Sequence, residues 1–180
     1  MDYIKLLKDN GLLRVIDEPA DIDLEIAHAS YIEVKRENSQ ALLFTNPVCK
    51  KTGRKFAPVL TNIYGSKRAL ELIFGRDPDE IASEIEKLLK PKKPKSFGEK
   101  LNFAAYLFEM RKIFTKRLKG EGECQQVKFM GEDVDLLSLP ALKTWPLDGG
   151  AFITMGHVYT QSLDGELQNV GMYRLQIYGK

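Results

Sequence analysis

The sequence is poor in cysteine and histidine, contains no long apolar run, and carries little net charge. Its two cysteines, Cys49 and Cys124, lie far apart without a CxxC spacing, which argues against a zinc site or a redox pair and predicts two reduced thiols. No stretch of about eighteen apolar residues occurs, so no transmembrane helix is expected. The first residues lack the apolar core of a signal peptide, so we expect a cytoplasmic protein. A formal net charge of +2 is too small to indicate a polyanionic partner.

Hydrophobic residues (43%) and charged residues (29%) are balanced as in globular proteins. Over residues 1–90, helical periodicity alternates with short apolar runs typical of strands. One helix is bounded by Ser66 and Gly75, and the next begins at Asp77-Pro78, an acid followed by a proline at the first helical position. This alternation predicts an α/β N-terminal domain. The expected helices cover residues 2–8, about 24–36, 66–74 and 77–90, and the expected strands cover residues 12–16, 41–44 and 58–61.

A segment rich in proline and lysine interrupts this pattern at residues 90–96. Pro91 and Pro94 prevent a continuous helix, and the lysines repel one another, which favours an extended basic linker. Binding to nucleic acid or to an anionic membrane surface is the alternative, but no aromatic residue accompanies the lysines to stack on bases. A further helix is expected at 97–117, and we place the first domain at residues 1–118.

The pattern becomes rich in strands after Gly122, and a long irregular loop with two prolines and two glycines is expected at 139–150. We therefore expect a second, β-rich domain at residues 119–180. It is incomplete, because its last strand runs almost to the final residue. The expected strands are 125–130, 134–137, 152–161 and 168–178.

The last two strands are expected to form a hairpin. Asp164-Gly165 favours a two-residue type I′ turn, because both residues tolerate a positive φ. Pairing outward from this turn places Thr160 opposite Asn169. In a regular register Arg174 then faces Met155, and the neighbouring side chains point to the other side of the ribbon.

A bulge near Gly171 would shift this register by one residue. Arg174 would then lie opposite Gly156 and diagonal to Thr154, on the same face as Asn169. That face suits an anionic ligand, because arginine offers a planar fork and glycine permits close approach. The amide oxygen of Asn169 could also ligate Mg²⁺ or Mn²⁺. The alternative is that Asn169 and Arg174 are ordinary exposed strand residues.

Several motifs in the second half of the chain occur in a fixed order. Together they resemble the UbiD family of decarboxylases, and the resemblance is most specific over residues 125–180. Residues 1–90 match more loosely. The motifs are Gly131-Glu132-Asp133-Val134-Asp135-Leu136-Leu137, Leu139-Pro140, Thr144-Trp145-Pro146-Leu147-Asp148-Gly149-Gly150, Phe152-Ile153-Thr154 and Asn169-Val170-Gly171-Met172-Tyr173-Arg174-Leu175-Gln176.

The resemblance implies a fold, a cofactor and a set of site residues. The fold is an α/β N-terminal domain followed by the beginning of a flavin-binding split β-barrel. The cofactor is prenylated flavin mononucleotide (FMN), with Mn²⁺ (or Mg²⁺) and K⁺ at its phosphate. Asn169 resembles the first metal ligand, Thr154, Met172 and Tyr173 resemble cofactor contacts, and Arg174 resembles both a cofactor contact and the catalytic arginine of the family.

The resemblance also implies a carboxy-lyase acting on an aromatic or α,β-unsaturated carboxylic acid, with ubiquinone or menaquinone biosynthesis as the favoured setting. A flavin prenyltransferase would supply the cofactor, and no nucleic acid is expected to bind. The full-length protein would be a homodimer or homohexamer in the cytoplasm, at the inner membrane surface if its substrate is prenylated. The catalytic acids of the family lie downstream of Lys180, so we expect the 180-residue chain alone to be inactive. A non-catalytic module that binds flavin or another anion is the alternative.

Overall fold

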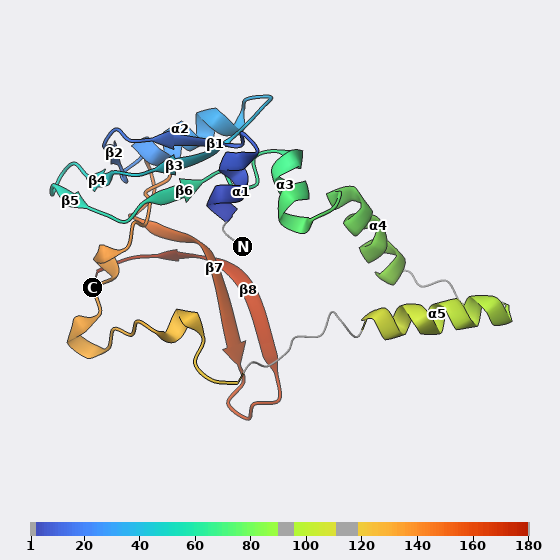
Figure 1. Ribbon diagram of the computed structural model, residues 1–180. Helices are drawn as coiled ribbons and strands as arrows, with labels where there is room; N and C mark the ends of the chain where they lie inside the picture. Colours follow the sequence, from blue (N-terminus) through green and yellow to red (C-terminus); the bar gives the residue numbers. More distant parts are fainter. Residues whose placement is uncertain (1–2, 90–95, 111–118, 180) are drawn as a thin grey trace. The chain divides into compact units, whose positions relative to one another are not determined.

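The structure is a computed structural model that describes residues 3–89, 96–110 and 119–179 (Figure 1). The chain forms two compact units, one made of Met1–Gly75 with Glu132–Lys180 and the other of Arg76–Gly131. The domain boundary near residue 118 stays a prediction. The helices are α1 (Tyr3–Asp9), α2 (Glu25–Val34), α3 (Lys67–Phe74), α4 (Pro78–Leu89) and α5 (Phe97–Met110), with short 3₁₀ turns at Glu123–Gln125, Gly131–Asp133 and Leu136–Ser138. The strands are β1 (Leu13–Ile16), β2 (Ala20–Asp21), β3 (Ala41–Phe44), β4 (Pro47–Cys49), β5 (Arg54–Lys55), β6 (Val59–Thr61), β7 (Phe152–Gln161) and β8 (Gln168–Gln176).

The first unit is built on a three-stranded sheet with the order β1-β3-β6. β1 and β3 are parallel and α2 lies between them in the chain, as in a βαβ unit, whereas β6 returns antiparallel to β3. Helices α1 to α3 and strands β1, β3 and β6 follow in the predicted order, and the mixed α/β class is confirmed. The sheet is small and open.

The central strand β3 has a buried core on each face. Leu42 and Phe44 pack with Ile26 of α2, whereas Ala41 packs with Leu7 of α1 and with α3. Because side chains alternate along a strand, α2 covers one face of the sheet while α1 and α3 cover the other. The sheet is therefore the middle of three layers.

One carboxylate is buried within this unit. Glu33 of α2 keeps only 2% of its side-chain surface exposed and is paired with the guanidinium groups of Arg14 and Arg36. It also accepts the backbone N–H of Gln40 at 3.0 Å. These bonds compensate the desolvation of the charge and tie α2 to β1 and to the start of β3.

Helix α3 begins and ends where the sequence predicts. The Ser66 side chain accepts the N–H of Ala69 at 3.2 Å, which is an N-cap. Gly75 follows the last turn with a φ of 70°, the left-handed conformation that favours glycine.

A second small sheet, with the order β2-β4-β5, was not predicted. Its strands contain only two or three residues each, which is too short for an alternating pattern to be recognised.

The predicted strands at 125–130 and 134–137 are wrong. In their place the chain forms 3₁₀ turns and irregular backbone. At the second of these segments the side chain of Asp135 accepts the N–H of Leu137 at 3.0 Å, which caps a short turn and competes with strand formation.

In the second unit, the bidentate pair of Arg76 with Glu84 (2.7 Å for each bond) ties the segment before α4 to that helix. The predicted basic linker at 90–96 lies outside the described residues except for its last position, and so does the part of the predicted helix beyond Met110. Among the helices that the structure describes, none combines the length and the apolar character needed to cross a bilayer.

Candidate functional site

The β7–β8 ribbon carries all the predicted site residues. The strands are antiparallel, and Thr160 pairs with Asn169 as predicted. The turn between them differs from the predicted type I′. Gly165 donates its N–H to the oxygen of Ser162, and of the two predicted turn residues only Gly165 has a positive φ (77°). Asp164 keeps a negative φ because its carboxylate accepts the hydroxyl of Ser162 and the N–H of Glu166, which stabilises a four-residue turn ending at Gly165.

The ribbon contains a β-bulge, but not where it was predicted. The register shifts between Ile153 and Gly156 of β7, so Thr154 and Met155 together lie opposite Arg174. The predicted bulge at Gly171 is wrong, and Gly156 pairs with Tyr173 rather than with Arg174.

Gly171 serves a different purpose in the ribbon. A Cβ atom there would lie 2.5 Å from the ring of Tyr173, two residues along on the same face. The missing side chain leaves space for that ring, so the glycine indicates a close approach and not a bulge.

The position of the bulge decides which face each side chain occupies. The extra residue belongs to β7, so β8 alternates regularly from Asn169 to Arg174. Five positions separate these two residues, which places them on opposite faces of the ribbon. The prediction that Asn169 and Arg174 share one face is therefore wrong. Arg174 instead shares a face with Met172.

Arg174 is held by two groups on its own face. Its Nη1 and Nη2 atoms donate to the two carboxylate oxygens of Asp148 at 3.1 and 2.5 Å. Its guanidinium carbon lies 3.7 Å from the ring centroid of Phe152, a cation–π contact. Asp148 thus holds the guanidinium by hydrogen bonds that lie in its plane, and the Phe152 ring packs against one face of that plane.

Asp148 is nearly buried, with 12% of its side-chain surface exposed, whereas Arg174 keeps 42%. The same carboxylate accepts the backbone N–H of Trp145 at 3.0 Å. Hydrogen bonds from Arg174 and then from the Trp145 backbone hold the pKa of Asp148 below its usual range, even though partial burial acts in the opposite direction. The aspartate is therefore ionised at neutral pH.

Thr154 borders a cavity of about 510 Å³ whose walls come from the end of the first sheet, the 139–142 segment and the start of β7. Met172 and Tyr173 follow on β8, with 64% and 49% of their surfaces exposed. Met172 shares its face of the ribbon with the guanidinium of Arg174. Tyr173 lies on the other face, so its role as a cofactor contact depends on the family resemblance.

Asn169 lines a cavity of about 420 Å³ formed by Thr160 and neighbouring residues of both strands. Within the described part of the chain, no three His, Cys, Asp or Glu side chains gather to hold a metal. Asn169 therefore supplies one hard oxygen, and Mn²⁺ or Mg²⁺ would need further ligands from elsewhere.

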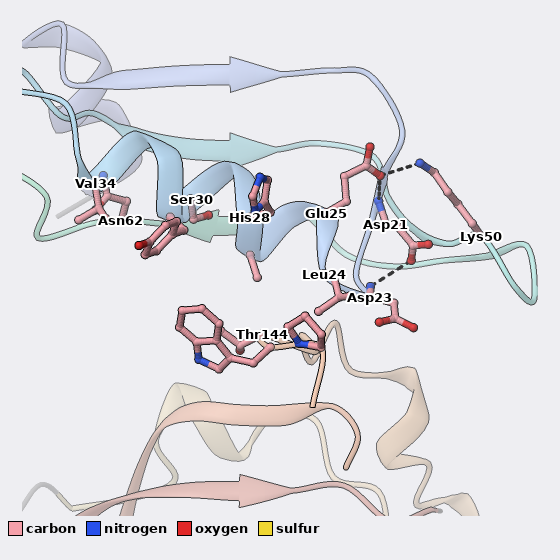
Figure 2. A pocket seen from close by; sticks show the side chains of 14 residues that line it. Asp21, Asp23, Leu24, Glu25, His28, Ser30, Val34, Lys50, Asn62 and Thr144 are labelled. Atoms are coloured by element: carbon pink, nitrogen blue, oxygen red, sulfur yellow. Dashed lines mark hydrogen bonds and ion pairs between the residues drawn. The ribbon is translucent and has the colours of Figure 1, made fainter. Parts of the chain in front are cut away.

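A larger cavity, of about 950 Å³, lies between α2 and the loop that precedes β7 (Figure 2). Tyr31 and Trp145 meet edge to face there, with ring centroids 5.9 Å apart. His28 of α2 also borders this cavity. Trp145 connects this cavity to the turn that carries Asp148.

The family models of two domains, both from one protein family, together match most of the chain. The N-terminal domain of 3-octaprenyl-4-hydroxybenzoate carboxy-lyase matches residues 4–89, and its Rift-related domain matches residues 116–180. The chain belongs to the UbiD family of decarboxylases.

Relatives of this UbiD chain occur in distant bacteria. An uncharacterized protein of Helicobacter pylori is 44% identical over 183 residues, which cover 99% of this chain and 29% of the relative. One from Aquifex aeolicus is 38% identical over 181 residues, covering 99% of this chain and 36% of the relative. The UbiD chain thus spans about a third of the length of the relatives it matches.

Solved UbiD-class structures share the fold. The enzyme HmfF from Pelotomaculum thermopropionicum, in complex with FMN, superposes with a TM-score of 0.68 at 19% identity over 99% of this chain and 34% of that one. Vanillic acid decarboxylase from Sedimentibacter hydroxybenzoicus, in its closed form, gives 0.69 at 22% identity over 98% and 34%. These likenesses show the fold.

The structure brings one further residue, Asp148, into contact with a predicted site residue. Asp148 stands within a motif that identifies the family, but sequence reasoning gave it no role. The available signal was an acid just before two glycines in a loop expected to be irregular. The pairing with Arg174, 26 positions along the chain, could not be read from that signal.

Proposed function

We propose that the full-length protein is a decarboxylase that removes CO₂ from an aromatic or α,β-unsaturated carboxylic acid with prenylated FMN. The observation that carries this proposal is the guanidinium of Arg174, held by Asp148 and Phe152 within a segment that matches the UbiD family. A fixed cation on an open face is suited to bind a carboxylate. The solved relatives include decarboxylases of vanillic acid and of 3,4-dihydroxybenzoic acid, and HmfF in complex with prenylated FMN.

The loss of CO₂ from an sp² carbon leaves a carbanion that no protein side chain can delocalise, and the prenylated flavin supplies the electron sink for it. The residues of this chain bind and orient. Arg174 contacts the substrate carboxylate, and Thr154, Met172 and Tyr173 contact the cofactor. Asn169 is one ligand of the Mn²⁺ (or Mg²⁺) that, with K⁺, accompanies the cofactor phosphate.

The remaining parts of the site come from the portion of the protein outside this chain. They include the other metal ligands, the acid that returns a proton and the rest of a split β-barrel. The substrate setting we favour is quinone biosynthesis, with cofactor from a flavin prenyltransferase. The assembly we favour is a cytoplasmic homo-oligomer, bound at the inner membrane surface if the substrate is prenylated.

The test uses full-length protein produced together with a flavin prenyltransferase. We expect CO₂ release from at least one acid in a panel of vanillate, 3,4-dihydroxybenzoate, 3-prenyl-4-hydroxybenzoate, 1,4-dihydroxy-2-naphthoate and cinnamate. Arg174→Gln should lower kcat/KM by about 100-fold or more, because a charged contact to the reacting group is lost. Glu166→Gln, a charge removed from the hairpin turn, is the matched control and should retain wild-type activity. No CO₂ from any acid, or equal rates for Arg174→Gln and wild type, would refute the proposal.

A further inference from the structure

The loop that carries Asp148 is held in place by its own backbone. The turn from Trp145 to Asp148 closes through the Asp148 N–H, which donates to the Trp145 oxygen at 3.0 Å, and through the carboxylate, which accepts the Trp145 N–H. Beyond the turn, a Cβ on Gly149 would lie 2.9 Å from the amide nitrogen of Gln176, so the loop passes close to β8. Asp148 is therefore positioned independently of the arginine that it binds.

Arg174 has no comparable restraint from its own strand. It lies opposite the bulge, where two residues of β7 face one residue of β8. Its long side chain carries about 2 kcal/mol of rotamer entropy in a free state. The contacts with Asp148 and Phe152 remove that freedom, so the fixed partner in this pair is the aspartate.

The geometry of the pair leaves part of the guanidinium available. An arginine side chain has five N–H donors in one plane. Asp148 occupies the edge formed by Nη1 and Nη2, and takes one donor from each nitrogen. The Nε–H and the outer N–H groups remain, and the Nε edge matches the two oxygens of a second carboxylate. Phe152 covers one face of the plane but not this edge.

We propose that Asp148 is a positioning residue, which holds the Arg174 guanidinium with its Nε edge toward the carboxylate of the substrate. This inference rests on the proposed function, in which Arg174 contacts that carboxylate. Asp148 itself touches neither substrate nor cofactor.

Removal of the Asp148 charge tests the orientation of the Arg174 guanidinium separately from its attraction for the substrate carboxylate. In Asp148→Asn the arginine keeps its charge and still attracts a carboxylate, but it loses its bidentate anchor. In the full-length enzyme loaded with cofactor, kcat should fall by about tenfold or more, while KM changes by less than about threefold. Rates are expressed per bound flavin, so that unfolded or unloaded protein does not contribute. Glu166→Gln, which removes a carboxylate from the β7–β8 hairpin away from Arg174, is the control.

A double variant distinguishes positioning from a general effect on folding. If Asp148 acts through Arg174, then Asp148→Asn should not lower kcat/KM further in an Arg174→Gln background. Asp148→Glu, which keeps both carboxylate oxygens on a longer arm, should recover part of the lost kcat. If Asp148→Asn does not fold, Asp148→Glu takes its place, and its kcat must then fall without a rise in KM. Additive losses, or wild-type kcat in the folded Asp148 variants, would overturn the inference.

Crystal structures of full-length wild type and Asp148→Asn give a readout that does not depend on activity. The guanidinium of Arg174 should leave the Phe152 ring in the variant. An unchanged guanidinium would overturn the positioning role even if the enzyme decarboxylates its substrate. If wild type releases no CO₂, the proposed function fails, and the two structures still decide whether Asp148 positions Arg174.

Discussion

Among the described residues, the nearly buried carboxylates of Glu33 and Asp148 are each paired with a partly exposed guanidinium. Glu33 of α2 pairs with Arg14 of β1, and Asp148 pairs with Arg174 of β8. The Glu33 carboxylate also accepts a backbone N–H from the start of β3, so it serves the fold. Asp148 is bonded to Arg174 and to the backbone of its own loop, which is the arrangement expected if it orients the Arg174 guanidinium as we propose.

The Asp148–Arg174 pair makes stability depend on pH in a defined direction. The folded-state pKa of Asp148 lies below the ordinary aspartate value of 3.8, chiefly because Arg174 donates to it. A lowered pKa stabilises the folded state above the unfolded pKa, and this contribution is lost as the pH falls through the folded pKa. The free energy of unfolding of Asp148→Asn should therefore differ from that of wild type more at pH 7 than at pH 3. Urea denaturation of both full-length proteins at the two pH values measures this, and an equal or larger difference at pH 3 would contradict it.

At the scale of elements, prediction succeeded where a local chemical signal sufficed. Ser66 and Gly75 bound α3 through a side-chain cap and a left-handed residue, both of which are encoded within a few positions. The β7–β8 hairpin was also predicted, with its Thr160–Asn169 pairing.

Prediction failed where distant contacts decide the outcome. The bulge lies at Thr154 and Met155, next to Phe152, whose N–H is bonded to the loop residue Leu142. The sequence suggested a bulge at Gly171 because glycine tolerates the backbone conformation of a bulge. A glycine alone, however, does not determine where in the ribbon the bulge forms. The position of the bulge determines which faces Asn169 and Arg174 occupy. The residues lie on the predicted strands, but the predicted geometry of the site was wrong.

The caps of α3 give a test at this scale. Ser66→Ala removes the acceptor for the Ala69 N–H and should lower the free energy of unfolding by about 1 kcal/mol. Gly75→Ala should cost about 1 kcal/mol because alanine resists a positive φ, and no neighbouring atom lies within 4 Å of the added Cβ to complicate the result. Ser66→Thr keeps the cap and is the control. Chemical denaturation measures all three, and a Ser66→Ala protein as stable as Ser66→Thr would contradict the assignment.

At the scale of the whole molecule, the ribbon exposes apolar side chains on both faces. Met172 lies on one face and Tyr173 on the other, and Tyr159 is 80% exposed. An apolar surface of this kind is usually covered in a complete protein. This chain spans only about a third of its relatives, and the proposed barrel would supply that cover.

The 180-residue chain should therefore behave differently from the full-length protein. We expect it to bind a hydrophobic dye more strongly per mole, to self-associate, and to release no CO₂ above the blank when mixed with prenylated FMN and the panel of acids. Dye fluorescence, light scattering and the CO₂ assay measure these properties. Turnover by the 180-residue chain alone would show that the site is complete without the downstream residues.

The central claim is that a carboxylate on an sp² carbon is replaced by a proton from solvent. The most direct measurement is NMR of the product formed in D₂O by the full-length protein loaded with prenylated FMN, using the acid that releases most CO₂. We predict one deuterium at the carbon that carried the carboxylate, with no such product from protein lacking the cofactor and strongly reduced product from Arg174→Gln. Unchanged acid after incubation with the loaded enzyme, or the same deuterated product without cofactor, would contradict the account.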